Sequence, residues 1–324
     1  MANLSLLGFK IDSRSDVFYL RLYGSIADCP ALKLISNMVG HTGYYCCFFC
    51  FVRGFHDSTV RKRQYPYSLH TPQRTKISFA LNGERAEQEN RNIFGQLGTC
   101  ILTPFVDIHL PSCLLVDYAH VTLLRHFRDV IRTVYASLSP AIRQQIDRSL
   151  RMQRFPNYFN RKMRGINELA FVKAVEMKNL LFYGLLPNLI DLVSMNQLSF
   201  LSLLVLGIRL IHGDKVLGDD TGSTANTLLI TYYRDHTKFF KGHLNFVLHL
   251  HEHFARLYDD HGPLSSVNTL AYEDFIGYIS RNRNGTRFHH DLLAYYYNID
   301  VHMKSNEKHE QERANGNNFW IYDN

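Results

Sequence analysis

The sequence predicts a mostly helical α/β protein. From about residue 116 onward, apolar residues recur at steps of three and four, which is the spacing of the buried face of an α-helix. Near the N-terminus, residues 17–23 are instead rich in β-branched and aromatic side chains, a composition typical of a strand. Apolar residues make up 46% of the 324-residue chain and aromatic residues 13%, so the chain has enough apolar surface to fill a core.

The first part of the chain is predicted to alternate between a strand, a helix and polar surface segments. Asp28 follows the predicted strand at 17–23 after a short turn. Pro30 favours a helix start, because its fixed φ suits the first helical turn, and residues 31–38 have helical spacing. Residues 53–90 are basic and polar, which predicts an excursion over the surface.

Helical spacing continues through most of the remaining chain. Helices are predicted at residues 123–134, from 140 through 146, two or three within 168–212, and at 244–258. Gly262 and Pro263 break the chain before a segment around 272–275. Residues 304–318 are charged and rich in Gly and Asn, which predicts a disordered tail.

One apolar stretch, residues 179–211, raises the question of a membrane span. It contains Pro187, Asp191 and Asn196. The uncharged runs between them are shorter than the roughly 18–20 residues that a membrane helix needs. Buried helices are therefore predicted, and no membrane association.

The charge balance favours a polyanionic partner only mildly. Lys and Arg outnumber Asp and Glu by 36 to 29, which gives a formal net charge of +7. Basic residues concentrate in segments 53–76 and 151–164, either of which could hold nucleic-acid phosphates. A solvated basic surface explains each segment equally well.

Cysteine spacing gives the strongest local indication of a site. Three of the six cysteines lie within residues 46–50, which suits a metal site better than a disulfide framework in a chain this long. A short turn can point the thiolates of Cys47 and Cys50 at one tetrahedral Zn²⁺. The alternative is a set of small buried hydrophobic residues beside the neighbouring phenylalanines. Whether Cys46 replaces Cys47 as a ligand stays open.

Two histidines much later in the chain offer a second pair of ligands. His249 and His253 are four residues apart and share one helix face, whereas His251 points elsewhere. With 17 histidines in the chain, one such pair is also expected by chance. Together with the cysteines, the pair predicts a Cys2His2 site. Its contribution to stability should depend on metal and pH, because thiolate ligands must be deprotonated.

Two acidic residues at predicted element ends are candidates for catalysis. Asp28 follows the early strand, and Glu273 lies in the segment after the Gly262 break. A two-metal nuclease needs several carboxylates that converge, so that two Mg²⁺ ions lie roughly 3.5–4 Å apart. For any single acid, a solvated surface position is the alternative.

Two segments of the first half carry a resemblance to a known family. The sequence ADCPA at 27–31 and GYYCCFFC at 43–50 are similar to a D-x-P-A block followed by G-x3-C-x2-C. VDYAHV at 116–121 is similar to a D-Y-M-H segment, with Ala119 in place of Met. These blocks resemble those of CACTA (En/Spm-like) DDE transposases.

The second half continues the resemblance in the same order. FVKAVEM at 171–177 is similar to the family's K-A-x-E helix, and the histidine pair, GPL at 262–264 and AYE at 271–273 follow. Asp28 precedes Cys47 by 19 residues, and His253 precedes Glu273 by 20. Both offsets match those of CACTA enzymes and of the related catalytic subunit of the V(D)J recombinase.

The resemblance implies a fold and a set of site residues. The expected fold is a partial RNase H-like core, without its N-terminal strands, that carries a large all-α insertion. Asp28 and Glu273 would be the second and third acids of the catalytic triad. The cysteine and histidine pairs would bind structural Zn²⁺, and any remaining catalysis would need Mg²⁺ or Mn²⁺.

The same resemblance implies domains, a location and partners. The expected segments are 1–80, a partial RNase H-like part with the zinc knuckle, and 81–242, the helical insertion. Residues 243–303 would hold the returning helices with the His pair and the third acid, and 304–324 a disordered tail. DNA is the expected partner, a homo-oligomer is possible, and the family is nuclear.

The chain also departs from the family pattern. Val247 stands where the family often has Asn, and Leu270-Ala-Tyr272 replaces Phe-Pro-Phe before the glutamate. The first triad aspartate is expected well upstream of Asp28, where Asp12 and Asp16 lie in a turn and are poor replacements. We therefore expect a transposase-derived chain that is inactive alone. The alternative is a domesticated, non-enzymatic, zinc-stabilised helical module that binds DNA or protein.

Overall fold

Two short parallel strands place the candidate acid Asp28. The computed structural model describes residues 7–10, 16–19, 21–154, 161–281, 295, 298 and 299. Within them, β3 (Ser25–Ala27) pairs in parallel with β6 (Leu114–Val116), and Ala27 is opposite Val116. Leu114 and Val116 are completely buried. Asp28 and Asp117 each follow one of these strands, so the two acids lie at the same edge of the pair.

Helix α2 (Cys29–Ser36) begins directly after this edge. The Asp28 carboxylate caps the helix by accepting a hydrogen bond from the Ala31 N–H at 2.9 Å. Pro30 occupies the first turn, where its missing N–H costs no hydrogen bond. The helix ends at Asn37, which adopts the left-handed conformation. The helix predicted at 31–38 is therefore confirmed, with a start two residues earlier.

The predicted strand at 17–23 is wrong in its extent. Among the described residues of this segment, only Val17–Phe18 form a strand, β2, which pairs antiparallel with β1 (Phe9–Lys10). The strand that leads to Asp28 lies beyond Gly24. A Cβ atom at position 24 would lie 2.7 Å from the Cys113 carbonyl oxygen, so glycine allows the close approach to the segment before β6. Composition marked residues able to form a strand, but the distant partner decided which of them pair.

The polar segment at 53–90 has more regular structure than predicted. It forms the hairpin of β4 (Phe55–Asp57) with β5 (Lys62–Gln64), followed by helix α3 (Lys76–Gln88). Thr75 and Ser78 form a reciprocal capping box at the start of α3. Among the described residues there are three two-stranded sheets, β1-β2, β3-β6 and β4-β5.

Helices dominate the chain after β6, which confirms the prediction of a mostly helical α/β protein. In order they are η1 (Ala119–Phe127, a π-helix), α4 (Arg128–Ser137), α5 (Pro140–Met152), η2 (Ile166–Phe171, a 3₁₀-helix), α6 (Ala174–Asn179), η3 (Leu180–Gly184, a π-helix), α7 (Leu185–Leu189), α8 (Met195–His212), α9 (Asp220–Phe239), α10 (Phe246–Leu250), η4 (His251–His253, a 3₁₀-helix), α11 (Phe254–His261) and α12 (Leu270–Arg281).

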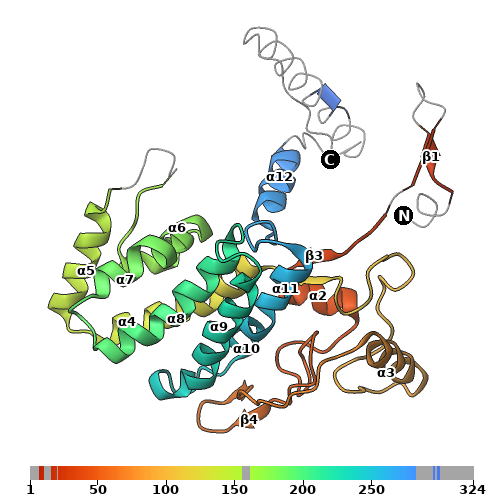
Figure 1. The fold of residues 1–324 in the computed structure, drawn as a ribbon, viewed down its shortest axis with the longest axis horizontal. Helices are drawn as coiled ribbons and strands as arrows, with labels where there is room; N and C mark the ends of the chain where they lie inside the picture. Colours follow the sequence, from red (N-terminus) through yellow and green to blue (C-terminus); the bar gives the residue numbers. More distant parts are fainter. Residues whose placement is uncertain are drawn as a thin grey trace. The chain divides into compact units, whose positions relative to one another are not determined.

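Helices α8 and α9 lie side by side and carry much of the apolar core (Figure 1). On α8, Phe200 stacks on Tyr232 of α9, with ring centroids 4.6 Å apart. Close approach is possible because Gly207 faces Leu229, where a Cβ would lie 2.8 Å from the leucine side chain. Helix α9 was not predicted, because its Thr- and Gly-containing sequence has weak helix propensity and α8 supplies the apolar contacts.

Helix α8 is long and apolar enough to cross a membrane, judged by length and composition alone. It is the one such helix among the described residues, and 39% of its apolar window is buried inside the protein. A core helix of a soluble protein has the same composition. The absence of a membrane partner therefore stays a prediction.

Residues Met1–Thr269 and Leu270–Asn324 form two separate compact units. Of the elements in the described residues, the first unit contains the six strands β1 to β6 and the helices through α11, and the second contains α12. The boundaries predicted at residues 80, 242 and 303 stay predictions. The predicted disordered tail at 304–324 lies outside the described residues.

Candidate metal centre

The cysteine-bearing loop is held in place by a buried arginine. Arg74 is 2% exposed, and its Nε donates hydrogen bonds to the carbonyl oxygens of Cys47 at 2.9 Å and Cys50 at 3.2 Å. The Phe49 N–H also points at the Cys47 sulfur, 3.4 Å away. These contacts close the turn so that both sulfurs face the same side.

The histidines come from a helix that changes its winding between them. Asn245 caps α10, its side chain accepting from the Leu248 N–H at 2.9 Å, and His249 lies in the last turn of that helix. The chain then tightens into the 3₁₀ turn η4, which ends at His253. Aromatic packing joins this helix to the cysteine loop, since Phe246 contacts Phe48 with ring centroids 6.1 Å apart.

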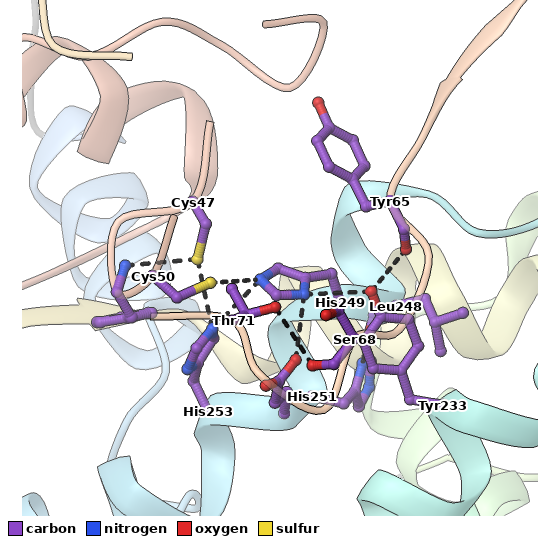
Figure 2. A network of polar contacts seen from close by, with 12 residues as sticks. Cys47, Cys50, Tyr65, Ser68, Thr71, Tyr233, Leu248, His249, His251 and His253 are labelled. Atoms are coloured by element: carbon purple, nitrogen blue, oxygen red, sulfur yellow. Dashed lines mark hydrogen bonds and ion pairs between the residues drawn. The ribbon is translucent and has the colours of Figure 1, made fainter. Parts of the chain in front are cut away.

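The two pairs meet, although Cys50 and His249 are 199 residues apart in sequence. Figure 2 shows the sulfurs and the imidazole nitrogens converging. The Cys47 Sγ is 3.4 Å from the His253 Nε2, and the Cys50 Sγ is 3.2 Å from the His249 Nε2. The two Nε2 atoms are 3.3 Å apart, and all four ligand atoms lie within 4.8 Å of one another.

This geometry fits a tetrahedral metal ion. Usual Zn–S and Zn–N bond lengths imply neighbouring ligand atoms roughly 3.3–3.8 Å apart around a tetrahedron. The S···N and N···N separations, 3.2–3.4 Å, lie at or just below the short end of that range. Three of the residues are completely buried and His253 is 3% exposed, which is typical of a closed structural site. The group can therefore hold a metal such as zinc.

A second layer of contacts fixes the ring of His249. The Tyr233 hydroxyl donates to the Tyr65 carbonyl oxygen at 2.6 Å, so its oxygen is left to accept from the His249 Nδ1–H at 3.2 Å. The Glu252 carboxylate is 3.4 Å from the same nitrogen. With Nδ1 as donor, Nε2 is the ring nitrogen that is left to bind a metal beside the sulfurs. Such outer contacts orient metal-ligating histidines.

The electrostatics of the group also favour a cation. Burial would raise the pKa of the Cys47 thiol, but its hydrogen bond with Cys50 and the positive charge of His253 and His249 bring that pKa well below its usual value. The pKa of Cys50 is raised, because its hydrogen bond to the Cys47 sulfur and its burial favour the neutral thiol. A second thiolate is thus disfavoured unless a cation balances its charge.

Neighbouring residues of the same type are excluded from the group. Cys46 is buried but is not among the four converging residues, so Cys47 is the candidate ligand of this pair. Burial raises the pKa of the Cys46 thiol. His251 points away, as predicted, and its Nε2 lies 3.1 Å from the Thr122 hydroxyl.

Asp28 lies at a different place, in a cleft of about 520 Å³ within the first unit. Its side chain is half-buried at the start of α2. The cleft is also lined by basic side chains and by one further carboxylate; these are His41, Lys62, His120, Arg125 and Asp129.

Asp117, the second acid at the strand edge, has a different environment from Asp28. It is completely buried and accepts hydrogen bonds from the Ala119 N–H, the Thr269 N–H and hydroxyl, and the His120 ring at 2.6 Å. Burial would raise its pKa, but the bonds from His120 and Thr269 lower it. Its oxygens are fully used, so Asp117 has a structural role and orients His120 toward the Asp28 cleft.

Glu273 lies in the first turn of α12 and is exposed. It belongs to the second unit, whereas the metal group and Asp28 belong to the first. The structure thus brings together four of the six predicted site residues, and it places Asp28 in a cleft.

Sequence reasoning missed three residues that support the metal centre. Arg74 was assigned to a basic surface segment, but its burial shows that it cannot contact a phosphate there. Tyr233 lies on the unpredicted helix α9, and Tyr65 contributes only a backbone carbonyl oxygen to the contact. Of these three residues, only Arg74 could have been noticed in the sequence, as a charged residue in a polar loop. Its charge, however, indicated an exposed position and not the buried one that it has.

No protein-family model and no curated protein matches the chain.

Proposed function

We propose that this chain is part of the catalytic core of a DDE transposase related to the CACTA family, which cuts and joins DNA strands. The observation that carries the proposal is the metal group. Two pairs of candidate ligands, 199 residues apart in sequence, form one buried Cys2His2 cluster. Each pair also stands at the family's sequence offset from one of the two acids. If a cysteine pair and one of many possible histidine pairs had met by chance, the two acids would not be expected at these sequence offsets.

The strand edge gives further support. In an RNase H-like core, a catalytic acid follows one strand of a parallel pair, and β3 with Asp28 has this arrangement beside β6. An RNase H-like core needs more strands than these two. The assignment of that fold is therefore part of the proposal. The helices between β6 and α10 would then be the family's all-α insertion.

In this role the residues of the cleft have separate tasks. Asp28 would hold a divalent cation, because its carboxylate is only partly used in capping α2. Lys62 and Arg125 line the same cleft and can bind a DNA phosphate. Mg²⁺ or Mn²⁺, when bound, would stabilise charge on the reacting phosphate oxygens. The resemblance alone implies Glu273 as the third acid of the triad.

Iron-directed cleavage of the polypeptide tests the proposal without requiring DNA cutting. Fe²⁺ that replaces Mg²⁺ reduces hydrogen peroxide to a hydroxyl radical and hydroxide, ascorbate returns the Fe³⁺ formed to Fe²⁺, and the radicals cut the backbone beside the ion. We expect cuts near Asp28, suppressed by excess Mg²⁺ and absent in Asp28→Asn. Asp129→Asn, a carboxylate of the same cleft, is the matched control and should cut normally.

The alternative is a non-enzymatic, zinc-stabilised helical module that binds DNA or protein. It is favoured by the fact that the metal group and the helical packing are complete without any catalytic carboxylate. Under this alternative the chain binds one zinc ion, but iron produces no cut that depends on Asp28. That result would refute the transposase proposal.

A further inference from the structure

A cavity of about 560 Å³ lies beside the cysteine loop, away from the Asp28 cleft. Three aromatic side chains and three arginines line it: Tyr44, Tyr45, Phe94, Arg53, Arg85 and Arg91. We call it the arginine–aromatic cavity. Neither the metal group nor the proposed catalytic site uses any of these side chains.

The cavity has a built framework. Phe94 and Gly95 both adopt positive φ angles, +47° and +90°. A Cβ at position 95 would lie 1.8 Å from the Tyr45 carbonyl oxygen, so glycine is needed where the two loops touch. Arg74 connects the same loops, since it donates to the Phe94 carbonyl oxygen at 2.6 Å and to that of Cys47 at 2.9 Å. The metal group and the cavity therefore share one support.

The aromatic side chains are held but not covered. Tyr44 is 51% exposed and Phe94 is 49% exposed. The Phe94 ring makes edge contacts with Tyr45 and Phe51, with centroids 5.5 and 5.7 Å apart, and these fix its orientation. The Arg63 guanidinium lies 3.7 Å from the centroid of the Tyr44 ring. Large exposed aromatic rings with fixed orientations are suited to stacking against a planar ligand.

The charges of the cavity favour an anion. Glu89, at the end of α3, pairs with both Arg85, at 3.2 Å, and Arg91. The side chains of these arginines are 52% and 64% exposed, so the ion pairs are weak and a phosphate can replace them. None of the residues that line the cavity offers a carboxylate to Arg53. Three arginines beside one carboxylate leave an excess of positive charge.

We propose that the arginine–aromatic cavity binds one unstacked nucleotide of single-stranded DNA. Arg53 and Arg91 would hold its phosphate, because guanidinium groups match phosphate oxygens in geometry and charge. The base would stack on Tyr44 or Phe94, a contact that tolerates any base. The cavity volume lies within the usual range for small ligands. This inference rests on the proposed function, since it names the form of DNA that the chain holds beside its metal group.

Binding of fluorescein-labelled oligothymidine to the full, zinc-loaded chain tests the inference. Stacking on one aromatic ring is worth roughly a 5- to 150-fold change in affinity. We expect Tyr44→Leu to weaken single-strand binding within that range and to leave binding of the matching duplex unchanged. In the double variant Arg53→Gln with Arg91→Gln, the negative slope of log K against log salt should become shallower by about 1.4. This change corresponds to two single-strand phosphate contacts.

Arg234→Gln is the matched control, because Arg234 is an exposed arginine paired with Asp235 at 3.2 Å, on α9 and outside both basic segments. It should bind like the parent chain. Equal losses in this control and the cavity variants would overturn the inference, as would tighter binding of single-stranded RNA than of DNA. Zinc content and melting temperature of Tyr44→Leu report whether the variant is folded.

The outcomes separate this inference from the proposed function. If cavity variants bind oligothymidine normally while iron still cuts at Asp28, the cavity assignment fails and the transposase proposal stands. If the variants lose binding but iron never cuts at Asp28, the cavity assignment stands on a non-catalytic DNA-binding module.

Discussion

Replacing one metal ligand, Cys50→Ser, should remove the zinc ion and lower the stability of the first unit. A metal bound by the group would join residues 199 positions apart, so it would act as a cross-link that limits the unfolded chain. Loop closure over that length corresponds to about 5 kcal/mol when it is treated with the relation used for disulfides. Zinc–ligand bonding adds to this, because whole structural sites contribute about 10–16 kcal/mol in small domains. The loop-closure value is therefore a lower limit.

For a unit of this size, a loss of about 5 kcal/mol corresponds to a fall in melting temperature of roughly 10 °C. We expect the parent chain to bind one zinc ion per molecule by elemental analysis and Cys50→Ser to bind none. Calorimetry or circular dichroism of the same samples should show the fall in melting temperature. Adding a chelator to the parent chain should reproduce it, and adding it to the variant should change nothing.

Cys46→Ser is the matched control for this experiment. Cys46 is 1% exposed, lies in the same loop and carries the same chemistry, but it is not among the converging ligands. It should keep its zinc, with a modest loss of stability from the altered core. Equal zinc loss in both variants, or a Cys50→Ser protein that melts like the parent, would refute the assignment of the ligands.

Two further predictions concern residues around the core. Tyr233→Phe removes the hydroxyl that orients His249, and chelator competition should show zinc affinity reduced by roughly 10- to 100-fold. Tyr232→Phe, whose hydroxyl contacts His126 at 2.8 Å instead, should keep the parent affinity, and equal losses would contradict this role. His236→Phe should flatten the acid dependence of stability. Burial lowers the pKa of His236 to about 3, so the unfolded chain takes up a proton that the folded chain refuses.

The direction in which stability changes with pH follows from this difference in proton uptake between the unfolded and the folded chain. Stability is lost as pH falls from about 6.5 toward the folded pKa, and at pH 5 the loss is about 2 kcal/mol. Neither ring nitrogen has a hydrogen-bond partner among the described residues, and Phe200 and Phe240 surround the ring, so phenylalanine fits its environment. Melting temperatures at pH 7 and pH 5, with zinc content followed, measure the effect. An unchanged acid dependence in the variant would show that other groups carry it.

Short-range patterns in the sequence were enough to predict several parts of this protein. The turn between Cys47 and Cys50 and the four-residue step between His249 and His253 depend only on local backbone geometry. Pro30 marked the start of α2 for the same reason, and the Gly262 break separated α11 from α12. The dominance of helices after β6 followed from the periodicity of apolar residues, which reports directly on a buried helix face.

Contacts between distant residues decided the rest. The strand beside Asp28 lies at 25–27 because β6, almost ninety residues later, pairs with it there. Arg74 is buried because the carbonyl oxygens of a folded loop need a donor, and its charge in the sequence predicted the opposite. Asp28 and Asp117 follow equivalent strands, but only the fold shows that one faces a cleft and the other is saturated with hydrogen bonds.

The sequence by itself thus determined which residues can ligate a metal, because ligand chemistry and helix or turn spacing are local properties. The tertiary structure alone decided that the two pairs meet, which of Cys46 and Cys47 takes part, and which tyrosine orients His249. The physical reason is that the cysteine and histidine pairs lie about two hundred residues apart in the chain, and that Tyr233 reaches His249 from a different helix. Apolar packing, such as that of Phe48 on Phe246, brings the cysteine loop and the histidine helix together, and no local pattern encodes this packing.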